Sequence, residues 1–254
     1  MNRVPQGRTI AVALGLGLAL CGETQAAFAG DHDGRWALLQ VTTTVAEIPI
    51  IGKMYATTSA LSVHDVESSG DRLSGAGTLC SLQLDSGTSM VETIIPPALR
   101  RVLPAPRLDA RLGHRNGTTT FFQALPTIVV GARLTKPYEA LPTNPKDRRV
   151  IDEDEDGAPG VTVRVEGIAS GDLHVVQRSW ARLDGAFLVD GTFGGIVRHG
   201  LSQSILDATS PFLRSSPRSR PLVERSYFRM GRIDRTAGCS DAIRRAKAWK
   251  ATAP

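Results

Sequence analysis

Apolar and polar residues alternate along most of this chain, and this repeat of two residues constrains its fold more than any other feature. The pattern is clearest in the stretches 35–45 and 161–166, whose apolar members are Ala37, Leu39, Val41, Val45, Val161, Val163 and Val165. Successive side chains of a β-strand point to opposite faces, so a period of two predicts strands with one buried face. The chain is therefore predicted to be mainly β.

Three short polar segments are predicted to turn the chain between neighbouring strands. They are Ser69-Gly70-Asp71, Asn116-Gly117 and Asp184-Gly185, the last of which would join strands over 173–183 and 186–197. Asn-Gly and Asp-Gly suit two-residue hairpin turns, because both central positions need positive φ angles. Turns that join strands locally favour an antiparallel meander over βαβ units.

Two short helices are predicted beside the strands. Pro96 and Pro97 suit the start of a helix over 98–103, because proline favours the first turn of a helix. Near the C-terminus Ser240 is predicted to cap a second helix. Its apolar face would hold Ala242, Ile243, Ala246 and Trp249. We expect this helix to dock onto the sheet, and the alternative is that its basic face binds a membrane surface.

The number of strands decides between two architectures. About ten strands cannot remain one open sheet without curling or splitting. Glycines inside the strand-like stretches allow the bends and bulges that closure needs; they are Gly75, Gly77, Gly191, Gly194, Gly195 and Gly231. We therefore expect an antiparallel up-and-down β-barrel with a short C-terminal helix, and a two-layer β-sandwich is the alternative.

The N-terminal segment 1–29 is predicted to be a signal peptide. Arg3 and Arg8 precede an apolar run over 10–21, and small residues around Ala29 offer a cleavage site. The mature part, 30–254, would be a single β-rich domain in the periplasm or outside the cell. The alternative is a lipid anchor at Cys21, which ends a lipobox-like Leu-Ala-Leu-Cys. No later apolar run has the length that a transmembrane helix needs.

Cys80 and Cys239 are the two cysteines of the predicted mature chain. Export would place them in an oxidising compartment, so we expect a disulfide between them, and two unpaired buried thiols are the alternative. The net charge of +5 comes mainly from arginines spread along the chain. No basic stripe interleaved with aromatic residues is present, so nucleic acid is not an expected partner.

An acidic run, Asp152-Glu153-Asp154-Glu155-Asp156-Gly157, is the sharpest local motif. It resembles the D-x-D-x-D-G start of EF-hand-like calcium loops, and the resemblance implies that Asp152, Asp154 and Asp156 bind calcium, with the carbonyl of Ala158 as a fourth ligand. The twelfth position is Val163, where an EF-hand has a bidentate Glu, so the motif is closer to the calcium loops of extracellular modules. The alternative is a solvated acidic turn balanced by the basic pair at 148–149.

The residues Gly34-Arg35-Trp36 at the start of the first strand resemble the G-x-W start of lipocalins. A helix after the last strands is also similar to that family. The resemblance implies a barrel that holds a small hydrophobic or amphiphilic ligand. Trp36 is expected to seal one end of the barrel, with its indole N–H bonded to a main-chain carbonyl.

Arg178, Trp180 and Arg182 share one face of a predicted strand. Guanidinium and indole groups in this pattern stack on an outer surface or recognise an anionic or sugar ligand. Signatures of common hydrolases, metalloproteases and phosphate-binding loops are absent from the sequence. We therefore expect an exported, non-enzymatic barrel that binds a small molecule or serves the cell envelope. A calcium-braced sandwich for adhesion or assembly, and a hydrolase with a dispersed site, are the alternatives.

Overall fold

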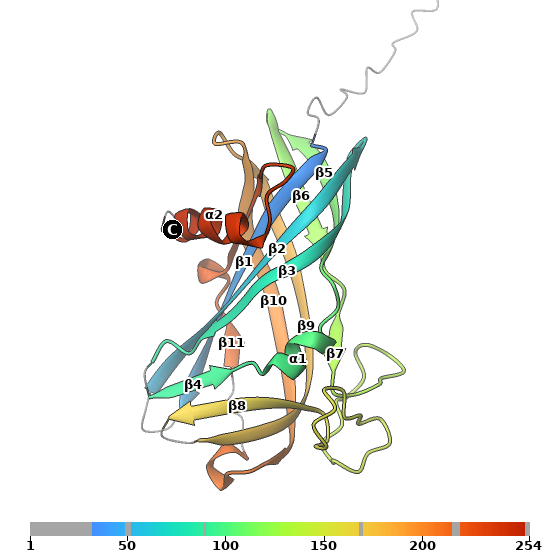
Figure 1. The fold of residues 1–254 in the computed structure, drawn as a ribbon, viewed down its shortest axis with the longest axis vertical. Coiled ribbons are helices and arrows are strands. Elements are labelled where there is room, and N and C mark those ends of the chain that lie inside the picture. Colours follow the sequence, from blue (N-terminus) through green and yellow to red (C-terminus); the bar gives the residue numbers. More distant parts are fainter. Residues whose placement is uncertain (1–31, 49–51, 89, 168–169, 215–218, 252–254) are drawn as a thin grey trace, which may run out of the picture.

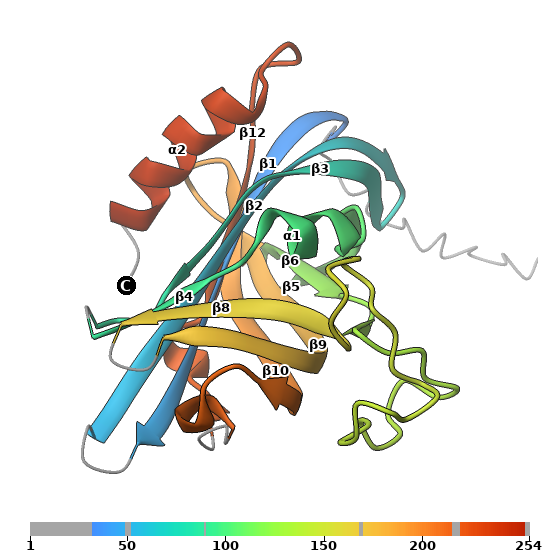
Figure 2. The same ribbon diagram turned by 60° about the horizontal axis from the view of Figure 1, so that its bottom comes forward.

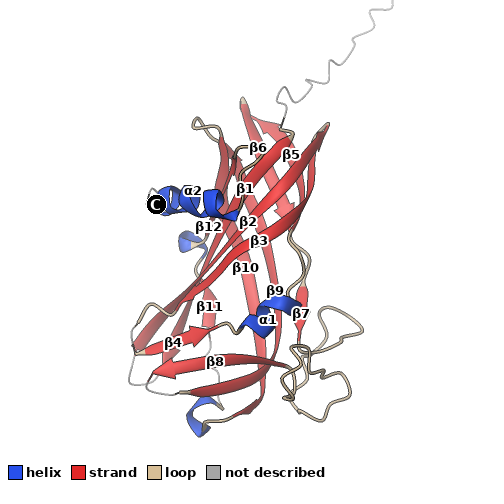
Figure 3. Cartoon of the chain, viewed as in Figure 1, coloured by secondary structure: helices blue, strands red, loops and turns tan. Residues whose placement is uncertain are grey.

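A computed structural model describes residues 32–48, 52–88, 90–167, 170–214 and 219–251. The predicted signal peptide and Cys21 lie outside the described residues. Twelve strands of the described part join one sheet (Figure 3). They are β1 (Gly34–Ile48), β2 (Gly52–Ser69), β3 (Arg72–Asp85), β4 (Val91–Ile94), β5 (Arg107–Arg115), β6 (Thr118–Ala124), β7 (Ile128–Val130), β8 (Val161–Gly167), β9 (Gly171–Phe187), β10 (Thr192–Ala208), β11 (Ser219–Pro221) and β12 (Tyr227–Arg232). The helices are α1 (Pro97–Val102) and α2 (Cys239–Ala251), with short 3-10 turns η1 (Pro211–Leu213) and η2 (Val223–Arg225).

Eight of these strands form a closed ring. Their order is β10-β12-β1-β2-β3-β5-β6-β9, and a further pairing of β9 with β10 completes the circle (Figure 1). Every pairing in the ring is antiparallel. Neighbours around the ring follow one another along the chain, so the predicted antiparallel barrel is confirmed.

The strand β9 is long enough to serve three partners besides β10. Its last part pairs with β6, its middle with β7 and its first part with β8, and β4 continues the sheet beyond β8. The strand β9 therefore belongs to the ring and also pairs with a part of the sheet outside it, which consists of β7, β8 and β4. The loop between β7 and β8 lies next to β9.

Two of the three predicted turns are confirmed. Gly70 has a φ of +59° between β2 and β3, and Asn116 and Gly117 have φ angles of +51° and +78° between β5 and β6. The turn predicted at Asp184-Gly185 is wrong, because both residues lie inside β9. The chain turns a few residues later, where the Leu188 N–H donates to the Thr192 carbonyl over 2.7 Å.

Gly185 allows close contact between two strands, which explains why the Asp-Gly pair wrongly predicted a turn. A Cβ built on Gly185 would lie 2.2 Å from the carbonyl oxygen of Gly194 on β10. Only glycine leaves room for such a close approach of two strands. The residue therefore permits a tight bend of the barrel wall.

The inside of the ring is filled by large side chains. Trp36, Leu183, Phe121, Phe193, Phe228 and Met230 are each at most 2% exposed and belong to one apolar cluster. Four aromatic rings of this cluster contact one another in series at tilted angles, with neighbouring centroids 5.2 to 5.8 Å apart. Interdigitated aromatic packing of this kind is a core that holds the ring together.

The helix α2 covers the outside of the ring over β1, β2 and β3 (Figure 2). Ala242, Ala246 and Trp249 pack on Leu39 and Leu61 and on other outward-facing residues of β1 and β2. The disulfide between Cys80 and Cys239 ties β3 to the first residue of this helix, across 159 positions of the chain, which confirms the predicted pair.

Two details of the helix prediction need correction. The helix α2 begins at Cys239, so Ser240 is not its cap. The carboxylate of Asp241 instead accepts the Gly238 N–H over 2.9 Å. Ile243 is 37% exposed and does not join the buried face.

The predicted helix over 98–103 corresponds to α1, and Leu99 is its buried residue. None of the described helices combines the length and apolarity that a membrane-spanning segment needs.

Candidate functional site

The segment 131–160, which joins β7 to β8 (Figure 1), is the longest connection of the described chain, and backbone hydrogen bonds join its two ends. The Arg133 N–H donates to the Arg149 carbonyl over 2.8 Å, and the Ile151 N–H donates to the Gly131 carbonyl over 3.1 Å. The Glu153 N–H reaches the Gly160 carbonyl over 3.1 Å. These bonds close the base of the segment and leave the acidic run as a small loop at its end.

Two glycines let this base lie directly on β9. Gly131 and Gly160 have φ angles of +80° and +92°, a region that favours glycine. A Cβ on either residue would lie within 2.6 Å of the Val175 carbonyl oxygen. The acidic loop is therefore fixed to the barrel wall at its base, and its end is positioned by the fold.

Three carboxylates of the loop converge at its centre. Asp152, Asp154 and Asp156 each offer one oxygen, and these oxygens all lie within 4.8 Å of one another. Calcium binds oxygen at about 2.3 to 2.6 Å, so two ligand oxygens on opposite sides of one ion are about 5 Å apart. The spacing of the three oxygens thus fits a single calcium ion.

Asp154 is the central member of this group. Its side chain is buried, with 6% exposed. One carboxylate oxygen, Oδ2, accepts the Thr162 N–H over 2.9 Å. The other, Oδ1, is buried and has no hydrogen-bond partner within the described part of the chain. An unpartnered carboxylate oxygen away from water is unfavourable, and a cation at the centre of the loop would remove that penalty.

The two flanking aspartates are arranged by backbone N–H groups. Asp152 accepts the N–H of Asp156 over 3.1 Å and that of Gly157 over 2.8 Å. Asp156 accepts the Ala158 N–H over 2.9 Å. Burial raises the pKa of Asp156, but hydrogen bonds from the Thr162 side chain and the Ala158 N–H outweigh it, so the pKa lies below its ordinary value. Asp156 is therefore ionised at neutral pH, as a calcium ligand must be.

Two other charged residues of this region, Glu153 and Arg149, have partners outside the acidic run. The carboxylate of Glu153 accepts the Gly131 N–H over 2.6 Å. Arg149 pairs with Asp147 at 2.7 Å and with Glu139 at 3.3 Å, so it does not balance the acidic run as the solvated-turn alternative requires. Calcium ligation by the three aspartates, and by the carbonyl of Ala158, stays a prediction. The sequence did not indicate that Thr162 belongs to this site, because no local motif predicts the hydrogen bond from its N–H to Asp154.

The predicted aromatic and arginine residues separate into different environments. Trp36 is 2% exposed inside the ring, and its indole N–H donates to the His32 carbonyl over 2.8 Å. Trp180 is 40% exposed, and the Arg182 guanidinium lies 5.9 Å from the centre of its ring. Arg178 donates to the carbonyls of residues 137 and 139 over 3.2 and 2.7 Å. Arg178 thus anchors the segment 131–160 to β9.

A buried serine and histidine resemble half of a hydrolase triad. The Ser62 hydroxyl lies 2.7 Å from Nε2 of His64. Both residues face the interior of the ring, and His64 is 1% exposed. The neighbouring Asp65 points to the other side of β2, where it pairs with Arg35 at 2.8 Å. Within the described residues Nδ1 of His64 has no hydrogen-bond partner, so no carboxylate among them orients the imidazole, and burial lowers the pKa of His64 to about 4.

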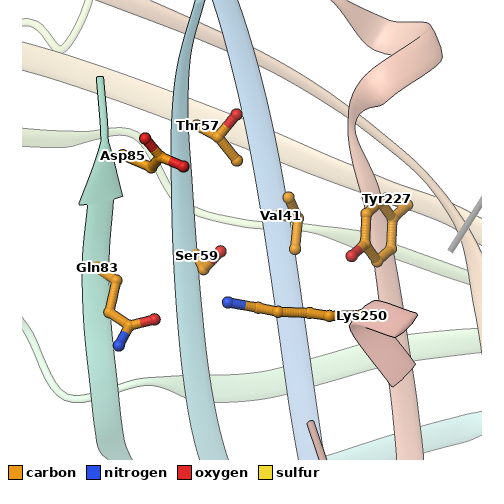
Figure 4. A pocket seen from close by; sticks show the side chains of 7 residues that line it. All are labelled: Val41, Thr57, Ser59, Gln83, Asp85, Tyr227 and Lys250. Atoms are coloured by element: carbon orange, nitrogen blue, oxygen red, sulfur yellow. The ribbon is translucent and has the colours of Figure 1, made fainter. Parts of the chain in front are cut away.

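A small depression lies on the outside of the ring near the end of α2. Its volume is about 280 Å³, and it is lined by Val41, Thr57, Ser59, Gln83, Asp85, Tyr227 and Lys250 (Figure 4). Burial raises the pKa of Tyr227, which keeps its phenol protonated. The lining mixes one ammonium, one carboxylate, one amide and three hydroxyl groups.

Comparison of the chain with protein-family models, with curated proteins and with solved structures finds no match in any of the three.

Proposed function

We propose that this protein is a non-enzymatic, calcium-braced β-barrel that acts in the cell envelope or outside the cell. The observation that carries the proposal is the carboxylate of Asp154, whose buried Oδ1 lacks a partner within the described chain and which converges with the carboxylates of Asp152 and Asp156. Export rests on the predicted signal peptide. Extracellular calcium is abundant enough to fill a site of modest affinity.

The role of the ion would be structural. The acidic loop closes the end of the segment 131–160, and the apolar residues of that segment pack on Val176 and Leu206 of the barrel wall. A cation that joins Asp152 to Asp154 would also fix the loop to β8, because Asp154 is bonded to Thr162. Calcium would thereby hold this segment in one conformation against β9 and β10.

An internal carrier for a hydrophobic ligand, as in lipocalins, has less support. Aromatic side chains already fill the ring between Trp36 and Phe228. An apolar ligand needs an open cavity, and these side chains occupy that part of the ring. The calcium-braced scaffold requires no internal cavity.

Thermal unfolding in the presence of calcium tests the proposal. A site of three carboxylates is expected to have a dissociation constant of about 10⁻⁴ to 10⁻³ M. At about 10 mM calcium, such a site stabilises the native state by about 1.4 to 2.7 kcal/mol. For a chain of this size that corresponds to an increase in melting temperature of about 3 to 10 °C. Magnesium should give a smaller increase, because it demands shorter and more regular coordination.

Two matched variants make the experiment specific. Asp154→Asn keeps the size of the side chain and an acceptor for Thr162 but removes the charge, so calcium should no longer raise the melting temperature. Glu155→Gln removes one charge from the adjacent, exposed position and should leave the response unchanged. An equal response in the wild type and in Asp154→Asn would contradict the proposal.

A further inference from the structure

The outer face of β6, β9 and β10 carries exposed aromatic, apolar and cationic side chains beside the segment 131–160. We name this surface the cationic aromatic face, and its members are Phe122, Tyr138, Trp180, Arg182, Ile196 and Arg198. Each of the five residues on the strands points away from the core, because its neighbours in sequence face the interior. Phe122, Trp180 and Ile196 are 42%, 40% and 38% exposed.

Trp180 forms a flat platform on this face. It lies opposite Gly200 in the pairing of β9 with β10. A Cβ on Gly200 would meet three atoms of the indole, the nearest at 2.5 Å. The missing side chain therefore lets the ring lie across the neighbouring strand, with part of its surface open to solvent. Exposed indole rings held in this way suit stacking on the apolar face of a sugar.

A second aromatic ring is presented by the segment 131–160. Arg178 bonds the carbonyls of Pro137 and Glu139, on either side of Tyr138. The Tyr138 phenol accepts a bond from the Thr127 hydroxyl over 3.1 Å, and its side chain is 75% exposed. Arg178 and Trp180 are successive outward residues of β9, so the anchored segment places Tyr138 at the edge of the same face.

The charge of the face is positive, and Asp184 of β9 offsets it only in part. Arg182 and Arg198 lie directly opposite each other in the pairing of β9 with β10. Like charges in that position are destabilising. Arg198 has a long contact of 3.7 Å with Asp184, and within the described residues no carboxylate forms a salt bridge with Arg182. An anion bound between the two guanidinium groups would remove this repulsion.

We propose that the cationic aromatic face binds an anionic polysaccharide built from uronic acid units. A uronate ring offers an apolar face for Trp180 and a carboxylate for the guanidinium groups of Arg182 and Arg198. Arginine binds planar carboxylates through two parallel hydrogen bonds. A neutral sugar would not offset the repulsion between Arg182 and Arg198, and an anion without an apolar face would not use the indole. This inference does not depend on the proposed calcium site.

Isothermal titration with a short oligogalacturonate tests the inference. The measurement is made in EDTA, so that its failure is distinguishable from failure of the calcium proposal, and neutral dextran and single-stranded oligothymidylate serve as comparison ligands. The wild type should bind the oligogalacturonate and should not bind dextran. Trp180→Ala and Arg182→Gln should each weaken this binding about tenfold, the effect of losing about 1.4 kcal/mol of contact free energy.

Lys247→Ala is the matched control, because it removes one exposed positive charge from α2, on another side of the ring. It should leave the affinity unchanged. Trp180, Arg182 and Lys247 are exposed, so all three variants should fold as the wild type does, and Arg182→Gln, which relieves the repulsion with Arg198, should melt no lower than the wild type. The inference is overturned if the wild type does not bind oligogalacturonate. It is also overturned if Trp180→Ala binds oligogalacturonate as tightly as the wild type. It is overturned as well if the wild type binds oligothymidylate as tightly as oligogalacturonate and Trp180→Ala does not weaken the binding of oligothymidylate.

Discussion

Acidification should destabilise this protein through His64, a residue that the fold buries in its neutral form. His64 lies on the inner face of β2, opposite Trp36 of β1. Its Nε2 contacts the Ser62 hydroxyl, whereas its buried Nδ1 has no hydrogen-bond partner within the described chain. Burial lowers the pKa of His64 from 6.5 to about 4, and the nearby charge of Asp65 opposes this shift only in part.

The sign of the effect follows from the two states of the chain. In the unfolded chain the imidazole takes up a proton near pH 6.5, and in the native protein it does so only near pH 4. Stability is therefore fully present above pH 6.5 and is lost as the pH falls toward 4. Between pH 7 and pH 5 the loss is about 2 kcal/mol, a large fraction of the stability of an ordinary domain.

Urea unfolding at pH 7 and pH 5 measures this loss. The difference in unfolding free energy between the two pH values should be about 2 kcal/mol smaller in His64→Gln than in the wild type, because glutamine does not titrate. His114→Gln is the control, since His114 is exposed on β5 and should leave the pH dependence unchanged. The reasoning would be refuted if His64→Gln lost as much stability on acidification as the wild type.

Two further predictions concern the covalent and steric constraints of the ring. Replacing Cys80 and Cys239 together by serine should lower the unfolding free energy by up to about 5 kcal/mol, because the disulfide closes a loop of 159 residues. Chemical denaturation measures this loss. An unchanged denaturation midpoint would show that the bond does not constrain the unfolded chain. Gly195→Ala should cost at least about 1 to 3 kcal/mol in the same assay, since its Cβ would lie 2.1 Å from the backbone oxygen of Asp184. Gly194→Ala should cost less, because its nearest contacts are the flexible side chains of Leu188 and Arg229; equal losses in the two variants would contradict the steric argument.

The local part of the fold could be predicted from short stretches of sequence. Asn116-Gly117 produced the expected turn because its φ angles depend on those two residues alone. Asp184-Gly185 carries a similar signal and lies inside a strand, because Gly185 serves the close approach of β10. A glycine that relieves a turn and one that relieves contact between strands are alike in sequence. Only the pairing of distant segments distinguishes them.

The candidate metal site shows the same division. Alternating carboxylates at 152, 154 and 156 could be recognised from their spacing, and their oxygens converge in the structure. The burial of Asp154 could not be predicted, because it arises from the placement of the loop on β8 and β9. Its unpartnered oxygen, which gives the strongest reason to expect a cation, is therefore a property of the tertiary structure.

The sequence by itself determined the strands, most turns between them, the covalent pair of cysteines and the order of charges in the acidic loop. These features follow from the alternation of side chains and from the conformational preferences of a few residues. The tertiary structure alone decided that Arg178 anchors a segment about 40 residues earlier in the chain, and that Trp180 and Arg182 share an exposed face with Arg198. Such contacts depend on the register of strands distant in sequence, which closure of the ring sets and which no local pattern encodes.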